Sequence, residues 1–387
     1  MKKELTLDTE EFDISPAMMN DKNVSLDLAG VVSLADISTS SQRTALTGTA
    51  ALLDCLILCP GFHLQQHADE LNKGEHPAAA ALTSGYVFRI ENPATVHYLQ
   101  KIGRTGCLTT VGVRDVRNRQ SKNALMETVF TMDNANIVSV GAQVIAVCLT
   151  VAVLVIIILM KDWWGLFVTL ILVFARLLNV ILVRRRCKPK WSGAREEDGP
   201  GDLLVLLSQD RWIKIVGDIN QIKAISSGQW LQEMSAPESW VAAFATVMVY
   251  LNAALASNAS QLGKVLLILL LIVSAGLLAV ANQWTDRLQM HGYVLEVVKE
   301  ETKAYERRLH MVKDLIEQYD GNADWALRLG LINLEDLHGP RRRGREDSIV
   351  DRVSRGLSES SSESRRPDSV RIRNRGKSSV EIQPAIL

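Results

Sequence analysis

Four serines near the carboxyl end of the sequence each follow an arginine by three residues, and their hydroxyls are the clearest candidates for covalent chemistry. The candidate phosphorylation sites are Ser348, Ser358, Ser369 and Ser378. Kinases that recognise basic substrates bind such an arginine through acidic groups of their cleft. Each phosphate would add about −1.5 to −2 charges at pH 7. The spacing therefore predicts kinase contacts and regulation of this segment by charge.

Cys187 is a candidate for S-palmitoylation, because it lies among cations just after a long apolar stretch. An inert thiol beside the membrane is the alternative. The five cysteines, at positions 55, 59, 107, 148 and 187, show no paired spacing. A cytosolic or membrane location would keep all of them reduced.

Arg176 is the single charged residue of an otherwise apolar stretch, and Asn179 follows it by three residues. On a helix the two side chains would share a face. Such a pair forms a candidate intramembrane polar site that binds an anion or a lipid headgroup between helices. The alternative is that Arg176 snorkels to the end of its helix and binds nothing.

Patterns for metal binding and catalysis are weak. Cys55, Cys59, His63 and His67 lie four apart and could ligate zinc from one helix face, but Pro60 would break that helix. A membrane di-iron centre requires several paired-histidine boxes, and the remainder of the seven histidines are scattered. The sequence contains no nucleophile elbow, zinc-protease motif, P-loop or dinucleotide fingerprint. We therefore expect no metal, no cofactor and no enzymatic activity.

Four apolar stretches must position these residues. They cover residues 137–160, 163–183, 239–258 and 265–285. A bilayer core of about 30 Å requires about 20 apolar residues of helix, which each stretch supplies. The short links within each pair predict two transmembrane helical hairpins, at residues 137–183 and 239–285. We therefore expect an integral, multi-pass membrane protein with an all-α membrane part.

The distribution of Lys and Arg predicts the orientation of these spans. Residues 184–190 contain five cations, whereas each hairpin tip carries one lysine. The positive-inside rule then places the loop at residues 184–238 in the cytosol. With four spans, both termini are also expected to be cytosolic.

Several segments outside the spans show patterns of their own. Residues 1–25 are acidic and are expected to be disordered. Residues 26–136 contain strand-like stretches at 85–90 and 107–116, which predict a small cytosolic α+β region. Residues 45–59 are apolar but too short to span, so they predict a buried or an interfacial helix.

The loop at residues 184–238 is expected to be a compact cap. It contains an apolar run at 203–207, an alternating stretch at 211–215 and a short helix at 218–226. It reads SQDRW at residues 208–212 and SGQWL at residues 227–231. In these motifs the chain resembles a group of fungal multi-pass membrane proteins that carry this loop between two helical hairpins. The resemblance implies the topology but no activity.

Residues 286–339 are expected to be a cytosolic helical region, because apolar residues recur there at spacings of three and four. The stripe comprises Leu288, His291, Leu295, Val298, Thr302, Tyr305, Leu309, Val312, Ile316 and Tyr319. It predicts one long helix that forms a homo-oligomeric coiled coil through residues 286–319 or packs on the protein's own cytosolic domain. Residues 340–387 lack aromatic side chains and are expected to be a disordered tail.

Overall composition narrows the function classes. With 43 Lys and Arg against 43 Asp and Glu, the chain is not a globally basic nucleic-acid binder. The tail at residues 340–387 has twelve basic and seven acidic residues, which favours contact with anionic lipid. We expect a non-enzymatic scaffold or regulator that presents cytosolic domains. The alternative is a channel or transporter subunit whose pore forms by oligomerisation.

Overall fold

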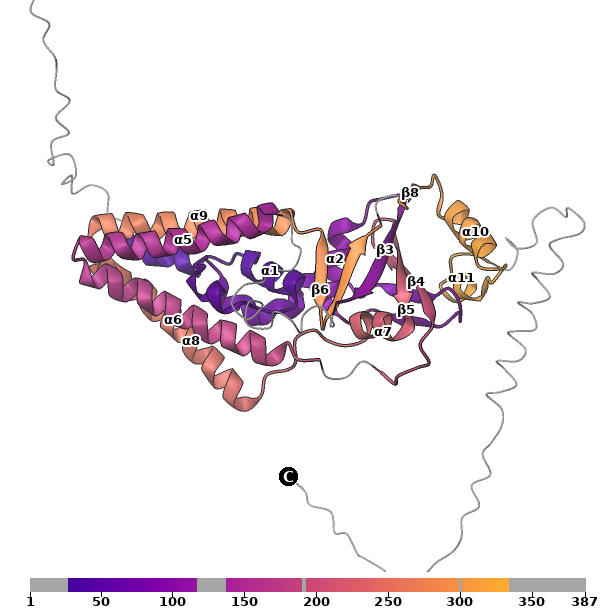
Figure 1. The fold of residues 1–387 in the computed structure, drawn as a ribbon, viewed down its shortest axis with the longest axis horizontal. Coiled ribbons are helices and arrows are strands. Elements are labelled where there is room, and N and C mark those ends of the chain that lie inside the picture. The colour runs from indigo at the N-terminus through magenta and orange to yellow at the C-terminus, as the bar shows by residue number, and fades with distance from the viewer. Residues whose placement is uncertain (1–26, 117–136, 190–192, 299–300, 334–387) are drawn as a thin grey trace, which may run out of the picture.

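The computed structural model describes residues 27–116, 137–189, 193–298 and 301–333, in which a helical part and a sheet part lie end to end (Figure 1). The helical part contains α5 (Ile137–Leu159), α6 (Trp163–Arg186), α8 (Ala236–Leu255) and α9 (Gln261–Gln283). Among the described residues these four are the helices with the length and apolar character of membrane spans. The prediction of four spanning helices is confirmed at that level.

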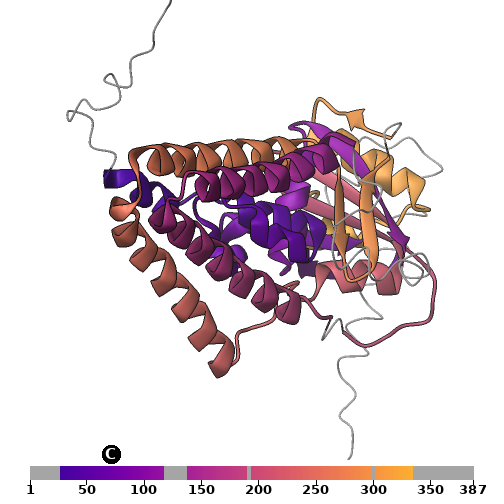
Figure 2. The ribbon, with the colours of Figure 1, turned by 60° about the vertical axis from the view of Figure 1, so that its left-hand side comes forward.

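The four helices form two pairs, each with one helix from either hairpin. Helix α5 packs along α9, and α6 packs along α8. The pairs meet at the hairpin tips, which are residues 160–162 and 256–260, and diverge toward the sheet (Figures 1 and 2). We call the ends of the helices nearest the sheet the base. Apolar side chains such as Ile145, Phe174 and Ile272 are exposed on the outside of the helices, as lipid contact requires.

Residues 27–72 fill the space between the two helix pairs, and we call them the threaded segment (Figures 1 and 2). They form the 3₁₀ helix η2 (Asp27–Leu34), helix α1 (Thr39–Thr47) and the 3₁₀ helices η3 (Leu52–Leu56) and η4 (Phe62–Asn72). Ile57, Leu58 and Phe62 share a core with all four spanning helices. Residues 45–59, expected as one buried or interfacial helix, are instead divided between α1 and η3 inside the bundle.

The sheet part has eight strands from three separate parts of the chain. The order is β2-β1-β4-β5-β3-β7-β6, and β8 also pairs with β3. The strands are β1 (Ala78–Ala81), β2 (Val87–Arg89), β3 (Cys107–Asp115), β4 (Pro200–Leu207), β5 (Arg211–Asp218), β6 (Arg287–Met290), β7 (Tyr293–Val297) and β8 (Lys303–Ala304). Strand β3 is parallel to β5 and antiparallel to β7. Residues before, between and after the two hairpins therefore build one sheet.

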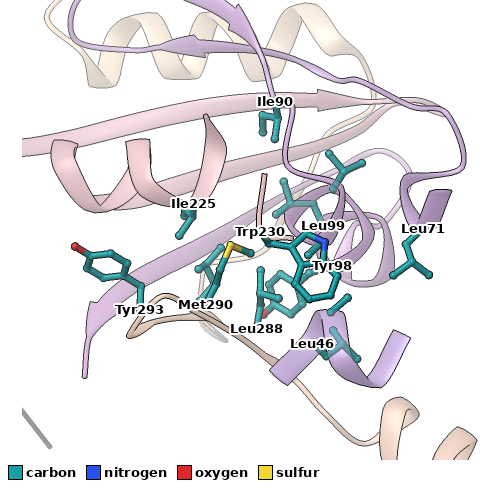
Figure 3. Close-up of a cluster of buried hydrophobic side chains, with 14 of the residues drawn as sticks. Leu46, Leu71, Ile90, Tyr98, Leu99, Ile225, Trp230, Leu288, Met290 and Tyr293 are labelled. Carbon is teal, nitrogen blue, oxygen red and sulfur yellow. The ribbon is translucent and has the colours of Figure 1, made fainter. Parts of the chain in front are cut away.

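Alternation along the strands gives the sheet two buried faces. Ile213 and Ile215 of β5 join one core cluster, whereas Trp212 joins another. The first face is covered by α2 (Pro93–Ile102) and α7 (Ile219–Ser226), and Figure 3 shows Tyr98, Leu46, Trp230 and Leu288 meeting there. The second face is covered by α10 (Arg308–Gln318) and α11 (Asp324–Arg328). This two-sided burial explains why the strands are rich in apolar residues.

Local signals explain the boundaries of several helices. Asn92 accepts hydrogen bonds from the backbone N–H groups of Ala94 and Thr95 and caps α2, which has proline at its first position. Asp218 caps α7 in the same way, through Asn220 N–H at 2.9 Å. Glu238 accepts from the Ser235 N–H at 3.0 Å, so α8 begins with a capping box.

The strands expected near residues 85–90, 107–116, 203–207 and 211–215 are present as β2, β3, β4 and β5. The prediction of a small α+β region is therefore confirmed in part. The sheet is larger than expected, because the loop after α6 and the chain after α9 add five strands to it.

The long helix and coiled coil expected over residues 286–319 are wrong. Residues 287–297 form the β6–β7 hairpin, and its turn is made by His291 and Gly292, both with positive φ (52° and 82°). Positive φ at both central residues is what a two-residue hairpin turn requires. Leu288 and Leu295 of the stripe pair across this hairpin and are fully buried in the sheet core. In the described part of residues 286–319 only α10 is helical, and it packs on the protein's own sheet through Met311 and Leu315.

Candidate functional site: a charged centre between the helices

Arg176 lies at the middle of α6 and points into the threaded segment rather than along its helix. Its side chain is 3% exposed. Its Nε–H donates to the Asp54 backbone carbonyl at 3.2 Å, and Nη1 donates to Gln65 Oε1. The guanidinium also lies 5.8 Å from the centre of the Phe62 ring, a cation–π contact. Residues of η3 and η4 thus hold the Arg176 side chain beside the middle of α6, and it does not extend to the end of its helix.

Asn179, the sequence-predicted partner of Arg176, is buried on the same helix. Its amide Nδ2 donates to the Ala175 carbonyl one turn earlier, at 3.2 Å. The structure therefore places both residues on the buried side of α6, but the groups that contact Arg176 come from the threaded segment.

Arg43 of α1 is a second buried cation between the helices, and no pattern in the sequence distinguishes it from an exposed arginine. Its Nη1 donates to Ser139 Oγ at 2.9 Å and to Thr285 Oγ1 at 2.7 Å. Ser139 belongs to α5 and Thr285 follows α9, so one guanidinium joins α1 to the base of the α5–α9 pair. Asn282 strengthens this joint, because its Nδ2 donates to the Thr39 carbonyl at 2.8 Å.

Asp54 is the acidic residue that lies near these arginines. Its carboxylate interacts electrostatically with Arg176, Arg43 and Arg184, and Oδ2 accepts from the Ala51 N–H at 2.8 Å. We call Arg43, Asp54, Gln65 and Arg176 the charged centre. Buried charges are costly unless they are paired and hydrogen-bonded, and here both arginines are hydrogen-bonded to other elements of the fold.

Gln65 connects the two halves of the charged centre. It accepts from Arg176 and donates through Nε2 to Thr44 Oγ1. The Thr44 hydroxyl in turn donates to the Ser40 carbonyl at 2.9 Å. The hydrogen bonds therefore run from α6 through η4 to α1, and this network fixes the three elements relative to one another. No group of three or more His, Cys, Asp and Glu residues that could hold a metal ion occurs among the described residues.

Three glycines that no sequence pattern singles out lie where the threaded segment touches other backbone. A Cβ on Gly30 would lie 2.4 Å from the Ala253 carbonyl oxygen of α8. A Cβ on Gly48 would lie 2.2 Å from the Gln289 oxygen of β6, and one on Gly61 would lie 2.5 Å from the Ile37 oxygen. Small residues permit this closeness, as they do between membrane helices.

Asp162 joins the two hairpin tips. Its carboxylate accepts from the Gly165 N–H at 2.9 Å, which caps α6, and from the Ser260 N–H at 3.0 Å. The Asp162 carboxylate also accepts a hydrogen bond from the Ser260 hydroxyl at 2.5 Å. Ser260 Oγ in turn accepts from the Gly263 N–H and so caps α9. Burial opposes ionisation of Asp162, but these hydrogen bonds outweigh it and lower the pKa of the carboxyl.

Cations also join the sheet to the base. Lys101 of α2 donates through Nζ to the carbonyls of Asn282 and Thr285 at 2.6 and 2.5 Å. A cation at the carboxyl end of a helix satisfies free carbonyls and complements the helix dipole. Val180 and Val183 of α6 belong to the same core cluster as Ile213 of β5. The base of α6 therefore shares a packed core with the sheet.

The other sequence-predicted site residues lie away from the charged centre. Cys187 follows α6 and packs against the core of the sheet, where burial raises the pKa of its thiol to about 12. It is therefore a protonated thiol at neutral pH in this conformation. The candidate phosphorylation sites Ser348, Ser358, Ser369 and Ser378 lie outside the described residues.

Comparisons of the chain with protein-family models, with curated proteins and with solved structures found no match.

Proposed function

We propose that the protein is a non-enzymatic membrane scaffold or regulator that presents its sheet part from a four-helix anchor. The observation that carries this proposal is the filling of the space between the helix pairs by the threaded segment. Ile57, Leu58 and Phe62 occupy that space with apolar side chains, and the charged centre holds them there. A single copy therefore offers a packed core in the place where a conduit would run.

The joint between sheet and helices also supports a scaffold. The carbonyls at the end of α9 are bound by Lys101, and Arg186 Nε donates to the Gln232 carbonyl at 2.6 Å. Such contacts fix the orientation of a cytosolic surface relative to the membrane, which is the task of a scaffold. The cations at residues 184–190 favour a cytosolic location of the sheet.

The alternative is a channel or transporter subunit with a pore formed by oligomerisation. It is favoured by Asn252 of α8 and Ser274 of α9, which are fully buried in spanning helices. Neither the Asn252 amide atoms nor Ser274 Oγ has a hydrogen-bond partner among the described residues. Polar groups of this kind inside a membrane are often functional.

The two functions are separated by reconstituting the full chain into vesicles and measuring ion flux beside the variant Asn252→Leu. If the protein is a scaffold, both proteins give only background flux. In addition, affinity purification of the tagged chain recovers partner proteins, and a core substitution that unfolds the sheet abolishes their recovery. Flux that rises with protein amount and falls in Asn252→Leu would contradict the scaffold and favour the oligomeric pore.

The tail at residues 340–387 adds a regulatory element to this proposal. Twelve basic and seven acidic residues leave an excess of five positive charges. Each cation near an anionic leaflet contributes about 1 kcal/mol of attraction. Three phosphates of about −1.5 to −2 charges each would cancel that excess and release the tail. Sedimentation of the unmodified peptide with anionic vesicles tests this switch, which fails if neutral vesicles bind the peptide equally well.

A further inference from the structure

We infer that residues 27–39 are a fifth crossing of the membrane that is not an α-helix, so that the chain before Asp27 lies on the side opposite the sheet. This inference rests on the membrane placement of the four helices but on neither proposed function. It replaces the sequence-based expectation that both termini are cytosolic.

The first end of the crossing lies at the hairpin tips. Helix η2 packs on α8 and α9 and on the turn η5 (Ala256–Asn258) that joins them. Gly30 rests directly on the backbone of Ala253, within the last turn of α8. The Ser33 hydroxyl donates to the Gly30 carbonyl at 2.6 Å, which fixes η2 against that helix. Asp27 is therefore beside the tips.

The second end of the crossing lies at the base. The Thr39 carbonyl accepts from Asn282, which belongs to the last turn of α9. Four residues later Arg43 donates to Thr285, and Gly48 touches the backbone of β6. Between Gly30 and Thr39 the chain has thus moved from one end of the spanning helices to the other.

The length of the segment matches this path. Helix α9 covers Gln261–Gln283, which at about 1.5 Å per residue is about 33 Å long. Eight residues of 3₁₀ helix in η2 supply about 16 Å at 2.0 Å per residue. Residues 35–38, which lie between η2 and α1, supply up to about 13 Å more at about 3.3 Å per residue. The total of about 29 Å nearly matches a hydrocarbon core of about 30 Å and leaves no length to spare.

The chemistry of the segment also suits a crossing. Residues 28–35 carry no charge, and the acids Asp27 and Asp36 lie toward its two ends. A non-helical backbone is tolerated at membrane depth only where protein covers it. Here Val32 and Leu34 pack into the core of the spanning helices, and Gly30 and Ser33 are buried.

Charge counting agrees with this orientation. Residues 1–26 contain three lysines and six acidic residues, whereas residues 184–190 alone contain five cations. Because orientation follows Lys and Arg while acidic residues count little, the strongly basic side remains at the base. The protein would then present an acidic segment on one side of the membrane and the sheet and basic tail on the other.

The test uses the full chain with one new cysteine at a time, in sealed vesicles whose cytosolic face points outward, and a membrane-impermeant maleimide. Asp27→Cys is expected to react only after the vesicles are opened with detergent. The control Glu197→Cys, an exposed position on the sheet side, is expected to react at once. Immediate labelling of both positions would overturn the inference.

A second measurement covers the case in which a cysteine disturbs the fold. An N-terminal tag with a glycosylation sequon is added to the otherwise unchanged chain, and a second tag follows its last residue. The N-terminal tag is expected to be glycosylated and resistant to external protease, while the C-terminal tag is digested. An N-terminal tag that is unmodified and digested together with the C-terminal tag would contradict the crossing.

Discussion

Single side chains join segments of this protein that are far apart in sequence. Arg176 binds residues of η3 and η4, Arg43 binds side chains beside α5 and α9, and Lys101 binds the end of α9. Of these three, only Arg176 could be singled out from the sequence, because it interrupts an apolar span. Arg43 and Lys101 lie in polar surroundings, where nothing in the sequence distinguishes a buried cation from a solvated one.

Arg176→Leu is expected to destabilise the protein strongly. The substitution leaves the Asp54 carbonyl and Gln65 Oε1 without their donor inside the bundle and removes a cation from near the Asp54 carboxylate. Removing one partner of a buried charged group costs about 3–5 kcal/mol. Thermal unfolding in detergent measures the loss. Arg185→Leu is the control, because that side chain is 70% exposed, and it should change stability by less than about 0.5 kcal/mol. Equal effects of the two variants would contradict the role of the charged centre.

Asp162→Ala is expected to loosen the hairpin tips, because it removes the cap of α6 and the bonds to Ser260. Loss of such a cap costs about 1 kcal/mol. The native pKa of Asp162 is lowered, so its contribution is complete above the unfolded pKa of about 3.9 and is lost as pH falls through the folded pKa. Stability of the parent chain should therefore decline below about pH 4 more steeply than that of Asp162→Ala. Parallel pH profiles would show that Asp162 does not hold the tips; Glu197→Ala serves as the control for an exposed acid.

At the scale of elements, sequence patterns identified what is local and missed what is long-range. Apolar runs indicated the four spanning helices and β4, and β-branched or alternating stretches indicated β2, β3 and β5. The β6–β7 hairpin was misread, since Leu288 and Leu295 also fit a helical spacing. The turn at His291 and Gly292 and the β-branched stretch after it were the signals for strands. The threaded segment was not predicted because 3₁₀ helices have no strong periodicity and because most of the helices it contacts lie far along the chain, as Arg43 and Ser139 do, 96 residues apart.

Two substitutions separate the hairpin from the coiled coil. Leu295 is fully buried in the sheet core, whereas Leu309 is half-buried on α10. Leu295→Lys is therefore expected to abolish folding, because it places an unpaired charge in the core. Leu309→Lys should leave a folded protein of somewhat lower melting temperature. A coiled-coil seam would make the two variants similar, with both simply reducing self-association in size-exclusion chromatography.

At the scale of the whole molecule, the sheet and the spanning helices form one mechanical unit. The order of the chain alternates between them, and β3 lies between strands that follow each of the two hairpins. Such interleaving cannot be predicted from sequence, because strand pairing between distant segments depends on the tertiary fold. It implies that neither part can be removed without exposing the core of the other.

Lys101→Met should weaken the joint between the two parts. It leaves the Asn282 and Thr285 carbonyls without their donor at the end of α9, where a cation contributes up to about 2 kcal/mol in a partly buried site. Faster proteolysis of the chain between α9 and β6 is the expected readout. Lys313→Met, at an exposed position of α10, should be cleaved at the parental rate. Equal cleavage of both variants would mean that Lys101 does not support the joint.

The packing of the threaded segment between the helices is the central claim, and amide hydrogen exchange of the full chain in lipid nanodiscs tests it most directly. Buried, hydrogen-bonded backbone exchanges only when the structure opens. Peptides from residues 50–65 are expected to be protected for hours, nearly as long as those from α6. Exchange of those peptides within seconds, while α6 remains protected, would show that the segment does not lie between the helices.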